Sequence, residues 1–224
     1  MLGCPHGITA LLFDLDGVLT DTAAVHAQAW KQTFEQEGYP FDIATDYVRY
    51  VDGKAREDGI KSFLASRGVH LPADEITRIG TKKNDLVLRL IREQGVEAYE
   101  GSRRYLEAAQ AAGLKLALVS SSANAAEVLD VTGMAPYMQE RVDGVVKAQL
   151  NLPGKPAPDT FLEAVRRLGV APEHAAVFED ALAGVQAGAA GHFGFVVGVN
   201  RADQAAALKA SGADIVVDDL SELL

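Results

Sequence analysis

Short apolar runs alternate with helical patterns along most of the chain, and this alternation limits the possible folds more than any other feature. An apolar run of four to six residues is typical of a buried strand. Strands that alternate with helices predict a doubly wound parallel sheet with helices on both faces, whose ligands bind beyond the carboxyl ends of the strands. The runs occupy residues 8–13, 114–119, 175–178, 193–197 and 215–217, and the helical patterns residues 103–112, 125–132, 160–168, 182–190 and 202–210.

The stretch from residue 23 to residue 98 breaks this alternation. It has helical patterns at residues 25–36, 57–67 and 74–94 and no convincing strand, so it predicts a helical insertion between the first two strands, with hinges at residues 20–22 and 98–101. Helices packed permanently on the sheet are the alternative. We therefore expect an α/β protein with a Rossmann-like core of residues 1–22 and 99–224 and a small α-helical cap domain of residues 23–98.

Two carboxylates follow the first apolar run, at Asp14 and Asp16. If the backbone continued as an ideal strand, both side chains would point to the same face. One carboxylate could then attack a substrate or bind a metal while its neighbour moves protons. Gly17 allows a sharp turn after the pair, and Asp21 or Thr22 can cap the next helix. An ordinary strand end with solvated acids is the alternative.

Composition excludes several classes of partner. Lys plus Arg is 21 and Asp plus Glu is 31, which gives a net charge of −10 and opposes binding to a polyanionic nucleic acid. The single cysteine, Cys4, excludes an internal disulfide and suits a reducing compartment. No apolar run approaches the length of a membrane span, and residues 1–7 lack the apolar core of a signal peptide. We expect a monomeric cytoplasmic protein without nucleic-acid or membrane partners.

Polar residues also follow the second apolar run and a later proline-rich loop. Residues 119–124 read VSSSAN, and a hydroxyl with free backbone amides at a strand-to-helix turn can hold phosphate oxygens. A helix cap is the more common role of such serines. Residues 154–159 read GKPAPD, where two prolines fix the loop and direct Lys155 toward the site. An ordinary surface lysine is the alternative, and Lys147 is a competitor for the role.

Adjacent acids end the third apolar run, at Glu179 and Asp180. Carboxylates at a strand end suit a hard divalent cation, although they could merely cap the following helix. The glycine patterns of the nucleotide-binding folds are missing, because the chain has no GxxxxGK[ST] sequence and Gly184, Gly188 and Gly191 do not fit GxGxxG.

The segments DLDGVLTDT, VSSSAN, KPAPD and ED, in this order, resemble the four motifs of the haloacid dehalogenase superfamily of phosphotransferases. The resemblance implies that Asp14 is the nucleophile that becomes an aspartyl phosphate and that Asp16 is the general acid and base. Asp16 points to phosphoryl transfer, because the dehalogenase branch has no aspartate there. Ser120 would bind phosphate and Lys155 would screen its charge. The implied Mg²⁺ site comprises Asp14, Asp16 through its backbone carbonyl, Glu179 and Asp180, and of the two adjacent acids we expect Asp180 to be the direct ligand.

The cap region resembles that of the β-phosphoglucomutase subfamily. In residues 21–30, DTAAVHAQAW, the side chains of Thr22, His26 and Trp30 are four residues apart and share one helix face. In residues 53–58, GKARED, Arg56 matches the arginine that binds a distal phosphate in that subfamily. The alternative for the helix face is half-buried packing, and the alternative for Arg56 is an intrahelical ion pair. The resemblance implies a substrate-binding set of Thr22, His26, Trp30, Gly53, Arg56, Lys83, Ser121 and Asn124.

The implied activity is the Mg²⁺-dependent interconversion of β-glucose 1-phosphate and glucose 6-phosphate. A sugar-phosphate phosphatase is the alternative, since the same residues could pass the phosphoryl group to water, and a non-catalytic phosphosugar-binding regulator is a third reading. Asp52 stands where the characterised mutases have a lysine, so the charge is reversed at one substrate-facing position. The physiological sugar phosphate is left open by this difference.

Overall fold

The computed structural model describes residues 2–224, in which six strands run parallel in one sheet of order β3-β2-β1-β4-β5-β6. The first strand therefore lies at the centre, and the chain adds strands outward first on one side and then on the other. The strands are β1 (Ala10–Phe13), β2 (Lys115–Val119), β3 (Glu140–Val142), β4 (Ala175–Glu179), β5 (Phe195–Val199) and β6 (Ile215–Val217). The predicted doubly wound α/β fold is confirmed.

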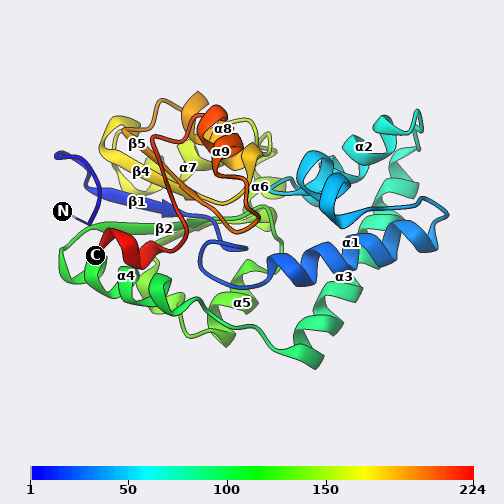
Figure 1. Cartoon of the computed structure of the whole chain (residues 1–224), viewed down its shortest axis with the longest axis horizontal. Coiled ribbons are helices and arrows are strands. Elements are labelled where there is room, and N and C mark those ends of the chain that lie inside the picture. The colour runs from blue at the N-terminus through cyan, green and yellow to red at the C-terminus, as the bar shows by residue number, and fades with distance from the viewer. Residues whose placement is uncertain (1) are drawn as a thin grey trace.

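Helices cover both faces of the sheet (Figure 1). Leu11 and Phe13 of β1 pack in one core with α4 and α5, whereas Ala10 and Leu12 pack in a second core with α7, α8 and α9. This alternation follows from the two-residue period of a strand, and a strand buried on both faces must be apolar throughout. The helices of the core are α4 (Glu100–Ala111), α5 (Ala125–Val131), α6 (Gly144–Gln149), α7 (Asp159–Leu168), α8 (Leu182–Ala190) and α9 (Ala205–Ala210), with short helical turns η2 (Ala135–Tyr137), η3 (Pro172–His174) and η4 (Leu220–Leu223).

The predicted helical insertion follows β1 and extends from the carboxyl ends of the strands (Figure 1). It has its own apolar core, in which Phe34 contacts Trp30 and Phe63 at ring-centre distances of 5.2 and 4.2 Å. Aromatic contacts of this kind add to the stabilisation that burial already provides. The insertion consists of α1 (Ala23–Gln36), η1 (Ile43–Val51, a helix of π type), α2 (Arg56–Ser66) and α3 (Ala73–Gln94).

The two connections between sheet and insertion lie side by side. Thr20 and Ala98 form an antiparallel bridge, the Tyr99 N–H donates to the Leu19 carbonyl, and the Asp21 N–H donates to the Glu97 carbonyl. Movement of one connection must therefore move the other. Among residues 2–224, no helix is both long enough and apolar enough to cross a bilayer.

Three local expectations need correction. Thr22 precedes α1, but neither it nor Asp21 caps the helix, because no side chain caps that end and the Thr22 hydroxyl donates to Asp16 instead. Strand β3 and helix α6 were not predicted, since β3 has only three residues and two of them, Glu140 and Arg141, are charged. Strand β5 begins at Phe195, two residues later than the apolar run.

Candidate active site

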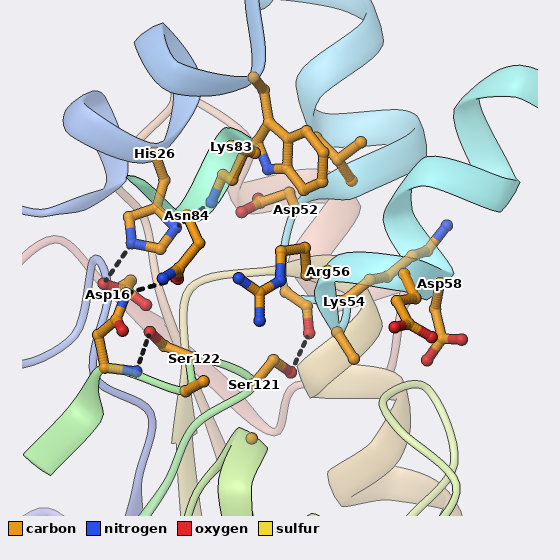
Figure 2. A pocket seen from close by; sticks show the side chains of 18 of the residues that line it. Asp16, His26, Asp52, Lys54, Arg56, Asp58, Lys83, Asn84, Ser121 and Ser122 are labelled. Carbon is orange, nitrogen blue, oxygen red and sulfur yellow. Dashed lines mark hydrogen bonds and ion pairs between the residues drawn. The ribbon is translucent and has the colours of Figure 1, made fainter. Parts of the chain in front are cut away.

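A cavity of about 240 Å³ lies between the carboxyl edge of the sheet and the insertion. It is far larger than one water molecule requires, so it has room for a small organic ligand. Asp14, Asp16 and Asp180 contribute from the core, and His26 and Arg56 from the insertion. Figure 2 shows His26 directed toward Asp16 and Arg56 extending into the space between Asp52 and Ser121.

Asp14 follows β1 directly and is 6% exposed. The Lys155 ammonium lies 2.5 Å from one oxygen each of Asp14 and Glu179, and it also donates to the Val119 carbonyl at 2.9 Å. The contacts with Asp14 and Val119 are hydrogen bonds, and the contact with Glu179 is an ion pair. Burial raises the pKa of Asp14, and Lys155 opposes part of that shift. Burial alone would lower the pKa of Lys155, but the two carboxylates raise it above its ordinary value, so the ammonium stays charged.

The competing lysine is elsewhere. Lys147 lies on α6 at the rim of the cavity, where its ammonium is 3.3 Å from an oxygen of Asp58. That pair connects the core to the insertion. Lys155, and not Lys147, is the cation beside Asp14.

Asp16 faces the insertion. Its Oδ1 accepts a hydrogen bond from the Thr22 hydroxyl and lies 3.7 Å from His26 Nε2. Burial raises its pKa, and the bond from Thr22 opposes the shift. At the next residue, Gly17 has a φ of +84°, and a Cβ there would lie 1.9 Å from an Asp180 oxygen. Only glycine permits this approach of the two acidic segments.

Three carboxylates form a candidate cation site. Ligand oxygens of Asp14, Glu179 and Asp180 all lie within 4.8 Å of one another, and the three residues are buried. Burial raises the pKa of Asp180 well above its ordinary value and that of Glu179 to about 8. A dense set of hard oxygen donors with so little compensating charge fits a divalent cation. Lys155 pairs with one oxygen each of Asp14 and Glu179, whereas within residues 2–224 no lysine or arginine pairs with Asp180, so Asp180 fits best as a direct ligand.

The serine cluster has several functions. Ser120 is buried and its hydroxyl accepts from the Ser122 N–H at 3.0 Å, so Ser122, rather than Ser120, lines the cavity. The Ser121 hydroxyl donates to the Gly53 carbonyl at 2.8 Å. The Asn124 amide donates to Asn84 at 3.0 Å. These two bonds connect the core to the insertion. The sequence predicts only a substrate contact for Ser121 and Asn124.

The insertion side carries buried basic groups. The Lys83 ammonium lies 3.0 Å from His26 Nδ1 and 4.7 Å from the centre of the Trp30 ring. Burial lowers the pKa of Lys83 to about 7 and holds that of His26 well below its ordinary value. Arg56 donates to the Gly80 carbonyl at 3.3 Å and also lines the cavity. Of the predicted stripe of Thr22, His26 and Trp30, the last two line the cavity, whereas the Thr22 hydroxyl bonds Asp16.

Tyr47 is a cavity residue that sequence reasoning missed. It belongs to η1, and its carbonyl accepts a hydrogen bond at 3.0 Å from the N–H of Asp52, which also lines the cavity. Burial raises the pKa of Asp52 to about 7, with Asp14 and Asp16 adding to the shift. The π-type helix that carries Tyr47 has no simple apolar period, so no sequence signal had placed it here.

Gly53→Ala is expected to lower turnover more than stability. Gly53 has a φ of +68°, and its Cβ would lie 2.7 Å from that of Ala181, so the methyl group forces the insertion away from the core. We expect a loss of about tenfold or more in kcat/KM for a sugar phosphate, since small misplacements are costly in catalysis. Gly68→Ala is the matched control, with a φ of +72° and nothing within 4 Å. Equal losses in both variants would contradict this expectation.

Comparison with known proteins agrees with this geometry. A family described as haloacid dehalogenase-like hydrolase matches residues 8–192. The chain is 51% identical to a β-phosphoglucomutase of Mycobacterium tuberculosis, covering 100% of this chain and 94% of that relative. It is 34% identical to a β-phosphoglucomutase of Bacillus subtilis, covering 96% and 91%. The crystal structure of β-phosphoglucomutase from Clostridium difficile superposes with a TM-score of 0.82 at 29% identity, covering 97% of this chain and 93% of that one.

Proposed function

The chain belongs to the haloacid dehalogenase-like hydrolase family, and from this premise we propose that it is a Mg²⁺-dependent β-phosphoglucomutase. It would interconvert β-glucose 1-phosphate and glucose 6-phosphate. The observation that carries the proposal is the cavity between core and insertion, to which the core contributes Asp14, paired with Lys155, and the insertion contributes Arg56. A mutase needs both, because its substrate must be held by a second group while the first phosphate is transferred.

The core residues perform the transfer. A carboxylate oxygen of Asp14 attacks phosphorus, and the bond from phosphorus to the sugar oxygen breaks as Asp16 donates its proton to that oxygen. The free hydroxyl of a sugar monophosphate, whose own phosphate is held by Arg56, then gives its proton to Asp16 and attacks phosphorus, so the bond from phosphorus to Asp14 breaks. The sugar bisphosphate formed in this way reorients, and its other phosphate is transferred to Asp14 next. The raised pKa of Asp16 favours the protonated form that an acid requires. Lys155 stays charged and stabilises the anionic oxygens in transfer.

We propose that Mg²⁺ is held by Asp14, by Asp180 and by the backbone carbonyl of Asp16, with Glu179 beside them. When bound, the cation would neutralise charge on the phosphoryl oxygens. Residues that touch the sugar phosphate or shape its cavity would be Thr22, His26, Trp30, Gly53, Arg56, Lys83, Ser121 and Asn124, with Ser120 supporting the phosphate loop.

We propose that residues 23–98 act as a cap domain on a core of residues 1–22 and 99–224, opening for exchange of the sugar phosphate. The single cysteine and the net charge of −10 support a monomer that works in the cytoplasm without nucleic-acid or membrane partners. Phosphorus NMR tests the activity directly. Protein with Mg²⁺, β-glucose 1-phosphate and a trace of glucose 1,6-bisphosphate should produce glucose 6-phosphate.

Arg56→Ala separates the mutase from a phosphatase. A bidentate guanidinium grips the phosphate that is not transferring, so its loss should cost about 2 kcal/mol or more of transition-state stabilisation in isomerisation. Hydrolysis of acetyl phosphate, which has no second phosphate, should change much less. Arg89→Ala, at an exposed position of α3, is the control. If the wild type hydrolyses glucose 6-phosphate as fast as it isomerises, and Arg56→Ala slows both equally, the protein is a phosphatase.

A further inference from the structure

The loop of residues 200–204, between β5 and α9, reaches the turn that carries Asp16. Arg201 Nε donates to the Gly17 carbonyl at 2.8 Å, and its Nη1 donates to the Asp218 carbonyl at 2.9 Å. Gly17 immediately follows Asp16 and packs against Asp180. The guanidinium is thus one residue away from the proposed acid and base, yet it does not line the cavity.

The same guanidinium also contacts the hinge. Its central carbon lies 3.7 Å from the centre of the Tyr99 ring, a close stacking contact. Tyr99 belongs to the second connection between core and insertion, and its hydroxyl donates to Asp21 of the first at 3.0 Å. One side chain therefore joins the catalytic turn to both hinge connections.

The loop is itself held in place and holds the other acidic segment. Asn200 accepts from the Gln204 N–H and donates to Asp218, both at 2.8 Å. The Gln204 amide donates to the Asp180 carbonyl at 2.9 Å. Two side chains of one loop, neither of which lines the cavity, thus bind the backbone of the two acidic segments. The loop of residues 200–204 therefore fixes the distance between the segment of Asp16 and Gly17 and the segment of Asp180.

We propose that Arg201 is a positioning residue of phosphoryl transfer, which fixes the turn after Asp16 to the hinge at Tyr99 so that Asp16 is aligned with the leaving oxygen. The role of Asp16 rests on the proposed function. Loss of Arg201 frees the Gly17 carbonyl and removes the surface on which Tyr99 stacks. The Asp16 carboxyl then samples orientations that cannot deliver a proton, whereas Asp14 keeps its partner Lys155.

The dependence on the leaving group tests this positioning role. A sugar oxygen needs a proton from Asp16 to leave, but acetate leaves from acetyl phosphate without one. With Mg²⁺-loaded protein, Arg201→Ala is expected to lower kcat for glucose 1-phosphate isomerisation and for glucose 6-phosphate hydrolysis by about 30-fold, which is part of the roughly 10²–10⁴-fold that a positioned acid contributes in full. Formation of the aspartyl phosphate from acetyl phosphate, measured in a single turnover, should slow by less than about threefold, because only the later attack on that intermediate needs Asp16 as a base. Arg201→Lys, which keeps a donor but not the planar surface, should be intermediate.

Arg103→Ala is the matched control, because Arg103 donates to the Thr132 carbonyl at 2.7 Å and lies away from the cavity. It should change both classes of substrate equally or not at all. Tyr99→Leu keeps Arg201 but removes the ring on which it stacks, and it should shift the ratio of the two substrates in the same direction as Arg201→Ala. This variant provides the test if Arg201→Ala does not fold. Equal losses for both substrate classes in Arg201→Ala and Arg201→Lys would overturn the proposal. A wild type that hydrolyses glucose 6-phosphate without isomerising glucose 1-phosphate would overturn the mutase function but not the role of Arg201. The comparison of glucose 6-phosphate with acetyl phosphate would still test that role.

Discussion

Asp14→Asn is expected to abolish Mg²⁺-dependent phosphoryl transfer, because an amide cannot accept the phosphoryl group as an aspartyl phosphate. The loss should be a factor of about 10⁴ or more, as for removal of other covalent nucleophiles. The change also removes one charge from the carboxylate cluster and should weaken Mg²⁺ binding. Asp16→Asn should still bind Mg²⁺ but turn over very slowly, because the proton carrier is gone.

Intact-protein mass spectrometry after mixing with Mg²⁺ and acetyl phosphate measures the aspartyl phosphate, and calorimetry measures Mg²⁺ affinity. Asp74→Asn, at an exposed position of α3, is the control and should behave as the wild type. A phosphoenzyme formed in normal yield by Asp14→Asn would show that another residue is the nucleophile.

Lys155→Met is expected to lower the free energy of unfolding by about 3–5 kcal/mol near pH 8, because it leaves Asp14 and Glu179 buried without their counter-charge. Both carboxyls already have raised pKa values, that of Glu179 being about 8. A group whose pKa is raised on folding stabilises the protein below its unfolded pKa, and this contribution is lost as the pH rises through the folded value. For Glu179 of the wild type this window extends from the ordinary 4.5 to about 8, and without Lys155 its folded pKa rises further. Both proteins therefore lose this contribution in parallel up to about pH 8, and the deficit of the variant should grow above that pH.

Urea unfolding of wild type and variant at pH 6 and pH 9, on either side of the wild-type Glu179 pKa of about 8, measures this deficit. Added Mg²⁺ should restore part of the stability of the variant, because a ligand of the native state stabilises it. Lys147→Met is the matched control, since Lys147 pairs with Asp58 at the cavity rim, where an ion pair contributes about 1 kcal/mol or less. A deficit that is the same at both pH values and in both variants would contradict the buried pairing.

The sequence predicts the acidic floor of the site because its signals are local. A carboxylate directly after a buried apolar run must lie at the carboxyl edge of a parallel sheet, and both Asp14 and Asp180 satisfy this rule. The pairing of β1 between β2 and β4 then brings these segments together. Lys155 was predictable as the partner only through the resemblance of its loop to a known motif, because nothing local distinguishes it from other loop lysines.

Other parts of the site depend on contacts between distant segments. Arg201 is 184 residues from Gly17 along the chain, and no spacing rule connects an arginine after β5 with a turn after β1. Tyr47 lies on a π-type helix whose period matches neither strand nor α-helix. Ser121 was assigned to the substrate, yet its hydroxyl bonds the Gly53 carbonyl, because closure of the insertion brings a backbone acceptor to it.

The central position of β1 determines when the site can form during synthesis. Leu11 pairs with Leu116 on one side and with Ala176 on the other, so the first strand to be made must wait for both partners. The insertion, made in between, has an aromatic core of its own and can condense while β1 is still unpaired. Asp14 therefore remains hydrated until β4 and the Lys155 loop have been made. In the nascent chain, Asp14 and Glu179 are therefore buried late and at the same time, when Lys155 is present to pair with both.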